Sequence, residues 1–268
     1  MLIPRRRSLK GFGIVLAAMG LARTAAAAAP NTPPAETDGP GGSLLPPGAH
    51  LLEVLIAKLA AAPRRRDYKT LPMILERRDE WDADGLDDIL HYTGSPKQSW
   101  DNTDISGPWL NVMRNSVNSE VWSFRHPDFL CVSATHGSAQ LALYDDQMWE
   151  KYGLAKLAGG NVTRNTFVAA PAAAEHDSRD YQSATGPFSS HANSIQVLQR
   201  RGVVFLACHN AVWETSERLI VAGTNPDKLS IEALCAELTN HVIPGVVVTP
   251  GAVGTLVELG RAGFVYAR

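Results

Sequence analysis

Two spacings of hydrophobic residues divide the chain near Pro96. Before that point, Leu51–Ala62 carries apolar residues three and four positions apart and is followed by Pro63, which predicts a helix. Arg64–Arg66 come next and are expected at a solvated helix terminus. Thr70–Tyr92 then indicates short helices with acidic surfaces. This first part of the chain is therefore predicted to be helical.

After Pro96, short apolar runs alternate with amphipathic segments. The predicted strands are Lys97–Asp101, Phe129–Thr135, Gly202–Ala207, Val246–Thr249 and an edge strand, Phe264–Ala267. The predicted helices are Pro108–Asn118, a stretch through Leu143 to Tyr152, a helix after Asn210 through Leu219, Ser230–Leu238 with Ser230 as its N-cap, and Val253–Ala262. This alternation favours right-handed β-α-β units, so we predict a three-layer α/β/α domain with a mostly parallel sheet, preceded by the helical extension.

The first residues have the pattern of a bacterial export signal. The paired arginines Arg6 and Arg7 are followed by Ser-Leu-Lys, the apolar stretch Gly13–Ala22 and the small residues Ala25–Ala29. This order indicates a cleavable signal for the twin-arginine route, whose translocation machinery would be a partner. The apolar stretch is shorter than the roughly 20 residues of a bilayer span. We therefore expect the protein in the periplasm.

The composition and spacing suggest four regions. Residues 1–29 form the expected signal peptide, and 30–50 form a linker rich in Pro and Gly that is expected to be disordered. Residues 51–95 form the helical extension, and 96–268 form the α/β domain. Val162–Ser194 has no lasting periodicity and is predicted to be a long loop, which in a compact domain is commonly functional or mobile.

Composition excludes several functional classes. Hydrophobic residues make up 45% of the chain and charged residues 19%, as in globular proteins, and the net charge of −2 offers no basic field for nucleic acid. The three cysteines form no CxxC pair, so an iron–sulfur cluster, a zinc ribbon and covalent haem are not expected. The phosphate-binding motifs GxGxxG and GxxxxGK and the serine motif GxSxG do not occur. We predict no cofactor.

The candidate site lies where three predicted strands end, because the carboxyl ends of parallel strands meet at one edge. Their ends carry the residues His136-Gly137, Cys208-His209-Asn210 and Pro250-Gly251. Cys208 is expected beside the N-terminus of a helix, whose field favours thiolate and would lower the thiol pKa from about 8.5. A thiolate attacks sulfane sulfur or accepts a persulfide. The other interpretation is a small apolar residue packed at the strand end.

Two histidines adjoin this cysteine in the predicted arrangement. His209 and His136 would handle protons because imidazole titrates near neutrality, although each fits a loop histidine bonded to backbone equally well. His191 and His241 add two potential ligands for a metal shared with Cys208. No pair of these histidines has the H-x-x-x-H spacing of a helix, so no metal site is predicted.

The remaining polar residues and cysteines have simpler interpretations. Asn210 is expected to cap the helix that follows it. Cys131 lies within a predicted strand and Cys235 within a predicted helix, so both favour inert core positions. A disulfide between Cys131 and Cys208 is an open alternative, because adjacent parallel strands would bring them close.

Three segments resemble the DsrE/DsrF-like sulfur-relay family. They are Gly202-Val-Val-Phe-Leu-Ala-Cys208-His-Asn-Ala211, Ile243-Pro-Gly-Val-Val-Val-Thr-Pro-Gly-Ala-Val253 and Val257-Glu-Leu-Gly-Arg-Ala-Gly-Phe-Val-Tyr266. Ala134-Thr-His-Gly137 is similar to the family's second strand end, and the resemblance spans Pro96 to Arg268. It implies a three-layer α/β/α domain that commonly forms homo-oligomers, and it maps the persulfide of the sulfur carriers onto Cys208.

The leading hypothesis is a periplasmic DsrE-like protein that binds or transfers sulfane sulfur through a persulfide on Cys208. His209 and His136 would move protons, Asn210 and Gly251 would shape the pocket, and a donor or acceptor protein would be a partner. The alternative is a non-catalytic subunit that binds a small molecule or a partner and whose cysteine is structural. A third hypothesis, a redox accessory that binds a cofactor or metal, is suggested only by the export route.

Overall fold

The computed structural model of the chain describes residues 42–159, 162–168 and 178–268. The expected signal peptide with Arg6 and Arg7, and the linker up to residue 41, lie outside the described residues. Contacts group these described residues into one compact unit. Within the described ranges, no helix combines the length and the apolar composition needed to cross a membrane.

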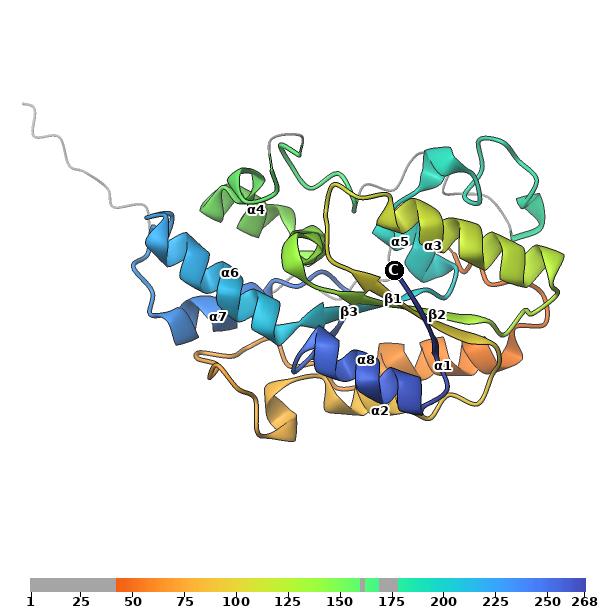
Figure 1. The fold of residues 1–268 in the computed structure, drawn as a ribbon, viewed down its shortest axis with the longest axis horizontal. Coiled ribbons are helices and arrows are strands. Elements are labelled where there is room, and N and C mark those ends of the chain that lie inside the picture. The colour runs from red at the N-terminus through yellow and green to blue at the C-terminus, as the bar shows by residue number, and fades with distance from the viewer. Residues whose placement is uncertain (1–41, 160–161, 169–177) are drawn as a thin grey trace, which may run out of the picture. The chain divides into compact units, whose positions relative to one another are not determined.

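Five parallel strands form one sheet in the order β4-β3-β2-β1-β5 (Figure 1). Their bounds are β1 Lys97–Asn102, β2 Leu130–Thr135, β3 Val204–Cys208, β4 Val247–Thr249 and β5 Val265–Ala267. Each predicted strand is confirmed to within two residues at either end. The closing strand β5 lies at an edge, beside β1, as predicted.

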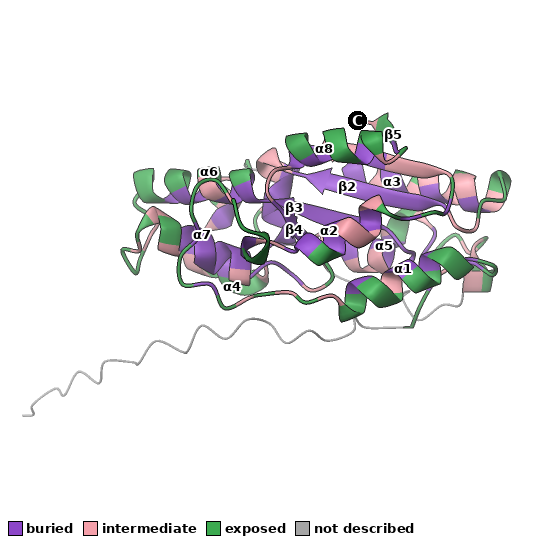
Figure 2. Ribbon diagram, turned by 90° about the horizontal axis from the view of Figure 1, so that it is seen from below, coloured by how far each residue is buried: buried purple, intermediate pink, exposed green. Residues whose placement is uncertain are grey.

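Helices cover both faces of the sheet and confirm the three-layer α/β/α class. The helices α1 His50–Ala61, α2 Ala83–Leu90 and α8 Ala252–Arg261 cover one face, and in Figure 1 they lie below the sheet. The other face is covered by α3 Trp109–Asn118, α4 Asp146–Tyr152, α5 Ile195–Arg200, α6 His209–Val221 and α7 Ile231–Asn240. The strands β2, β3 and β4 are buried at every position, whereas the outer side of α8 is exposed (Figure 2). Both faces of β2 and β3 are therefore core, which explains the continuous apolar sequence of β3 and the largely apolar sequence of β2.

Helix ends follow local side-chain chemistry. Ser230 caps α7 as predicted, because its side chain accepts a hydrogen bond from Ala233 N at 3.3 Å. The stretch predicted through Leu143 to Tyr152 is interrupted, so that prediction was wrong in its continuity. A 3₁₀ segment, η3 Gly137–Leu143, ends where Tyr144 bridges to another segment, and Asp145 then caps α4.

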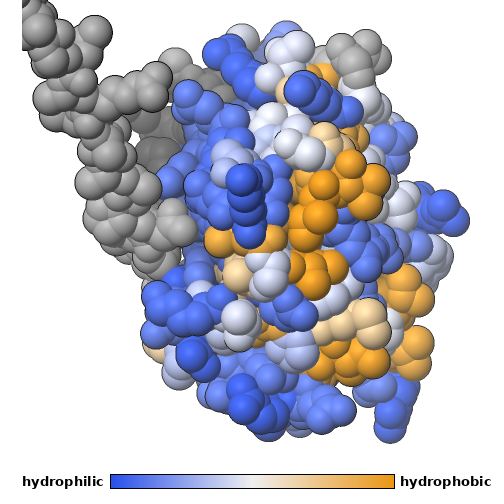
Figure 3. Space-filling model, turned by 90° about the vertical axis from the view of Figure 1, so that its left-hand side faces the viewer, coloured by the Kyte–Doolittle hydropathy of each residue, from blue (hydrophilic) through white to orange (hydrophobic). Residues whose placement is uncertain are grey.

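The long loop and the surface complete the description. The described parts of the predicted loop at 162–194 contain only the short 3₁₀ turns η6 Ser178–Asp180 and η7 Ser190–Ala192, and residues 169–177 lie outside the described residues. Apolar side chains form several separate groups on the side where α6 and α7 lie (Figure 3). At the end of α6, Val221 is 89% exposed.

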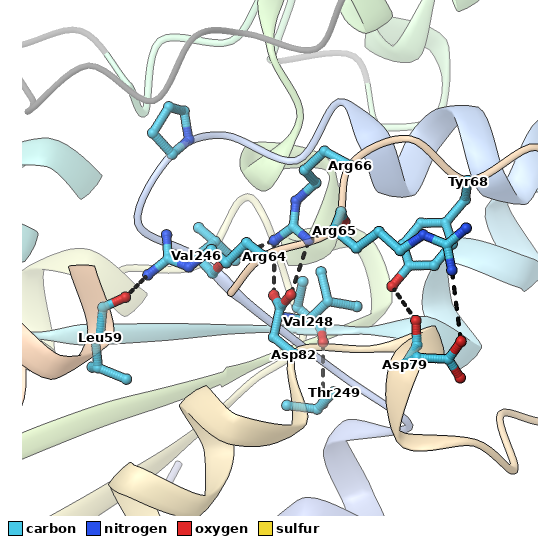
Figure 4. A network of polar contacts seen from close by, with 12 residues as sticks. Leu59, Arg64, Arg65, Arg66, Tyr68, Asp79, Asp82, Val246, Val248 and Thr249 are labelled. Atoms are coloured by element: carbon cyan, nitrogen blue, oxygen red, sulfur yellow. Dashed lines mark hydrogen bonds and ion pairs between the residues drawn. The ribbon is translucent and has the colours of Figure 1, made fainter. Parts of the chain in front are cut away.

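The helical extension is joined to the sheet at the outer edge of β4 (Figure 4). The N–H of Asp82 donates to Val248 O at 3.0 Å, and the N–H of Val248 donates to Asp82 Oδ2 at 2.7 Å. Arg66 donates to both carboxylate oxygens of Asp82, at 3.0 and 2.7 Å, and is only 13% exposed. The expectation that all three arginines would be solvated was therefore wrong for Arg66, because a buried carboxylate partner holds it in place.

Candidate functional site

The carboxyl ends of β3 and β4 form a switch point of this sheet. β3 continues into α6 on one face, whereas β4 continues through Pro250 and Gly251 into α8 on the other face. Open α/β sheets bind ligands where the connections diverge in this way, outside the carboxyl ends of the strands. Cys208, the last residue of β3, lies at this point.

The sulfur of Cys208 receives two backbone hydrogen bonds from two different helices. Ala211 N in the first turn of α6 donates to Sγ at 3.4 Å, and Ala252 N at the start of α8 donates at 3.2 Å. The amide ends of two helices therefore meet at one sulfur atom, an arrangement that stabilises negative charge. It is buried in a cluster with the small side chains of Ala134, Ala211 and Ala252, and Leu256 packs against this cluster.

Burial nevertheless governs the ionisation of this thiol. Cys208 is 4% exposed, and desolvation raises the pKa of its thiol, against the opposing effect of hydrogen bonds from Ala252, Ala211 and Asn210. The expected lowering of the pKa was therefore wrong, because the loss of water around the sulfur outweighs the field of the two helix ends.

His209 points away from Cys208, toward the opposite face of the sheet. Its Nε2 lies 2.7 Å from Pro72 O, which can only accept, so Nε2 carries the proton. Its Nδ1 then accepts from the thiol of Cys235, with 3.8 Å between Sγ and Nδ1. Burial lowers the pKa of His209, so the ring is neutral at pH 7. The structure does not bring this imidazole to the sulfur of Cys208.

His136 follows β2 and is held by Asp101 of the neighbouring strand β1, which Tyr266 of β5 contacts in turn. Its Nε2 lies 2.7 Å from Asp101 Oδ1, and the hydroxyl of Tyr266 donates to Asp101 Oδ2 at 2.7 Å. Burial opposes ionisation of Asp101, but these two hydrogen bonds hold its pKa below the usual value. Thr135 of β2 pairs with Ala207 of β3. The residues that follow them, His136 and Cys208, therefore both lie at the carboxyl edge of the sheet.

Sequence reasoning missed Asp101 and Tyr266. A signal for Asp101 was present, since it was the last residue of the first predicted strand and that strand ends at the same edge as the other three. Tyr266 carried no such signal, because its hydroxyl reaches Asp101 only once β5 pairs beside β1.

The other predicted residues shape the same edge. Gly137 has φ of +56°, and a Cβ there would lie 2.6 Å from Thr103 O. Cys208, and not Asn210, is the N-cap of α6, so the capping role expected of Asn210 was assigned to the wrong residue. Asn210 is exposed, and its Nδ2 lies 2.7 Å from where a Cβ of Gly251 would be. Any side chain at position 251 would displace this amide.

The three cysteines are free and buried, so the alternative disulfide between Cys131 and Cys208 does not form in this structure. Desolvation raises the pKa of both Cys131 and Cys235 to about 12. In the described part of the chain, no three His, Cys, Asp or Glu side chains come together as ligands for a metal.

A separate pocket lies at the start of α3. Its volume is about 200 Å³. It is lined by Gly107, Pro108, Trp109, Leu110, Asn111, Thr166, Phe167 and Asn193. Its lining combines polar and aromatic side chains.

Comparison of the chain with models of known protein families, with curated proteins and with solved structures found no match. The candidate site therefore rests on the geometry described above.

Proposed function

We propose that this chain is a DsrE-like periplasmic protein that carries a sulfane sulfur atom as a persulfide on Cys208. The supporting observation is the pair of backbone N–H groups, from Ala211 and Ala252, that point at one sulfur from two helix ends. A persulfide anion formed there would be stabilised by both helices. The buried side chains in the same cluster, those of Ala134, Ala211 and Ala252, are small.

The proposed loading step is nucleophilic. The thiol of Cys208 loses its proton, and the thiolate attacks the outer sulfur of thiosulfate. The new S–S bond forms as the S–S bond of thiosulfate breaks, and sulfite leaves with the electron pair. In this proposal His136, oriented by Asp101, takes the thiol proton at the shared edge. Because burial raises the pKa of the thiol, loading is expected to accelerate as the pH rises.

The experiment is sulfur loading with single cysteine variants. Purified protein incubated with thiosulfate or polysulfide should gain cyanolysable sulfur and a mass increase of about 32 Da. Cys208→Ser should lose both signals. Cys131→Ser and Cys235→Ser are matched controls that should keep them, because both sulfurs are buried in the core on the other face of the sheet from Cys208. Loading of Cys208→Ser at the rate of the unsubstituted protein would refute the proposal.

A binding subunit with a structural cysteine is the second candidate. The burial of Cys208 and its raised pKa favour it, as does the separate pocket at the start of α3. Under this proposal, iodoacetamide does not alkylate Cys208 in the folded protein, and incubation with sulfur donors leaves the mass of the protein unchanged. A small ligand binds in the pocket at the start of α3. Replacing the pocket residue Thr166 with a bulky Leu should then abolish that ligand's binding without changing Cys208.

The same proposal includes two partners. The chain would exchange sulfur with a donor or acceptor protein, and it would assemble into a homo-oligomer. The edge strand β5 supports self-association, because Val265 and Tyr266 are exposed there and one side of the strand has no partner strand in the sheet. Light scattering coupled to size-exclusion chromatography tests the assembly. A monomer at all concentrations would contradict this part of the proposal.

A further inference from the structure

A buried arginine without a carboxylate partner lies at the edge of the sheet opposite to Cys208. Arg201 follows α5 and precedes β3, whereas Cys208 ends β3. The side chain is 3% exposed, and its Nη2 donates to the amide oxygen of Asn118. Its Nε and Nη1 are buried and have no acceptor. Burial lowers the pKa of this guanidinium to about 9, so it still carries its charge at neutral pH.

A second guanidinium faces the first. Arg114 on α3 donates to Phe188 O at 3.0 Å and to Asn111 Oδ1 at 2.8 Å, while its Nε is buried without an acceptor. After burial, the charge of Arg114 is the next cause that lowers the pKa of Arg201. Over the described ranges, neither arginine forms an ion pair with a carboxylate.

The surroundings of the two arginines add further donors. Phe188 is the centre of this cluster, because its ring lies 4.6 Å from Arg201 Cζ and its carbonyl oxygen already accepts from Arg114 and from Asn118 Nδ2. Trp122 packs edge-on against the same ring at 5.9 Å, and its indole N–H is also buried without an acceptor. Four unpaired N–H sites therefore surround Phe188: Arg114 Nε, Arg201 Nε, Arg201 Nη1 and Trp122 Nε1.

A buried cation with unpaired donors is costly unless an anion offsets it. Guanidinium N–H groups match the paired oxygens of a carboxylate or another oxyanion, and an indole N–H adds a third direction of contact. We propose that Arg201, Arg114 and Trp122 form a binding site for a small oxyanion or carboxylate. This site lies at the amino end of β3, so it is separate from the proposed sulfur site at the carboxyl end.

The test compares the stability of the protein and its variants with different anions. Melting temperatures of the full chain are measured in sodium chloride, acetate, sulfate and phosphate at matched ionic strength. A saturable rise of at least about 2 °C over chloride is expected for the unsubstituted protein. Comparing acetate with sulfate and phosphate distinguishes a carboxylate site from a site for inorganic oxyanions. Only the class of anion that the site binds should raise the melting temperature to a plateau at low concentration.

Three variants make the outcome specific. Arg201→Met removes the buried charge at similar volume, so it should melt at or above the unsubstituted protein in chloride and lose the response to the anion. Arg114 is less buried than Arg201, and Arg114→Met should weaken the response to the anion. This second variant keeps the test decisive if Arg201→Met does not fold. Arg261→Met, on the exposed side of α8, is the control that should respond as the unsubstituted protein does.

Equal responses in Arg201→Met, Arg114→Met and Arg261→Met would overturn the proposal, since they would show a general effect of salt on the surface. Absence of a saturable response in the unsubstituted protein would overturn it as well. Neither result depends on Cys208, so the sulfur-carrier proposal stands or falls separately.

Discussion

Replacing Asp82 with alanine tests how the helical extension is fixed to the sheet. The carboxylate of Asp82 is 2% exposed and accepts three hydrogen bonds, two from Arg66 and one from Val248 N. Its loss leaves a largely buried guanidinium without its partner and an N–H of the edge strand β4 without an acceptor. Removing one partner of a buried ion pair costs about 3–5 kcal/mol. That is a large part of a typical folding free energy of about 5–15 kcal/mol.

The assay is urea unfolding with extrapolation of the free energy to water, together with the slope m. Asp82→Ala is expected to lose about 3–5 kcal/mol at unchanged m. The matched control is Asp87→Ala, which removes a 2.7 Å contact with Arg78 between side chains that are 45% and 59% exposed. An exposed pair of this kind contributes about 0–1 kcal/mol.

A double-mutant cycle with Arg66→Ala isolates the pair itself. Once the arginine is absent, Asp82→Ala should cost less than it does in the unsubstituted protein, because only the contact with Val248 is left to lose. A loss of about 1 kcal/mol or less for Asp82→Ala, or a loss equal to that of Asp87→Ala, would refute the claim that this contact anchors the extension.

Three further predictions concern the carboxyl edge of the sheet. Gly137→Ala should lower the unfolding free energy by about 1–3 kcal/mol, because φ is +56° and the added Cβ meets a carbonyl oxygen at 2.6 Å; Gly153→Ala, with φ of +59° and open space, should cost less in the same urea titration. The hydrogen bond with His136 contributes to the depressed pKa of Asp101, so the stabilising contribution of this carboxylate is present above about pH 4 and is lost as the pH falls through the folded pKa. The difference in melting temperature between the unsubstituted protein and Asp101→Asn should therefore shrink from pH 6 to pH 3, and a constant difference would contradict this. Iodoacetamide labelling of Cys208, followed by peptide mapping, should have its midpoint above about pH 8.5, and a midpoint below that value would show that the helix ends prevail over burial.

The sheet was predictable from the sequence because burial on both faces leaves a local signature. Val204–Cys208 and Leu130–Thr135 are buried at every position, so the first appears as a continuous apolar run of strand length and the second as a largely apolar one. The break between η3 and α4 had no such signature. It depends on the bridge from Tyr144 to Val242, a contact between residues far apart in the sequence.

Contacts over long sequence distances also decided which charges are buried. Arg66 and Arg201 look alike in the sequence, since each is part of a short run of basic residues. One is neutralised by Asp82 beside β4, whereas the other is enclosed beside Asn118 and Phe188 without a carboxylate. Nothing in the local sequence distinguishes these two environments, because both are created by segments that arrive from elsewhere in the fold.

The composition of the candidate site follows from the alternation of side chains along a strand. Neighbouring residues point to opposite faces. Cys208 therefore faces Ala134 and Ala252, and His209 faces Cys235 on the other side of the sheet. Adjacency in the sequence had suggested that Cys208 and His209 would act together, but alternation separates them. The same rule places Asp101, which pairs with Ala134 in the sheet, on the face of Cys208, and His136 two residues beyond Ala134 joins them. The imidazole that shares a face with the sulfur is therefore that of His136, which is why the proposed loading step assigns the thiol proton to His136 and not to His209.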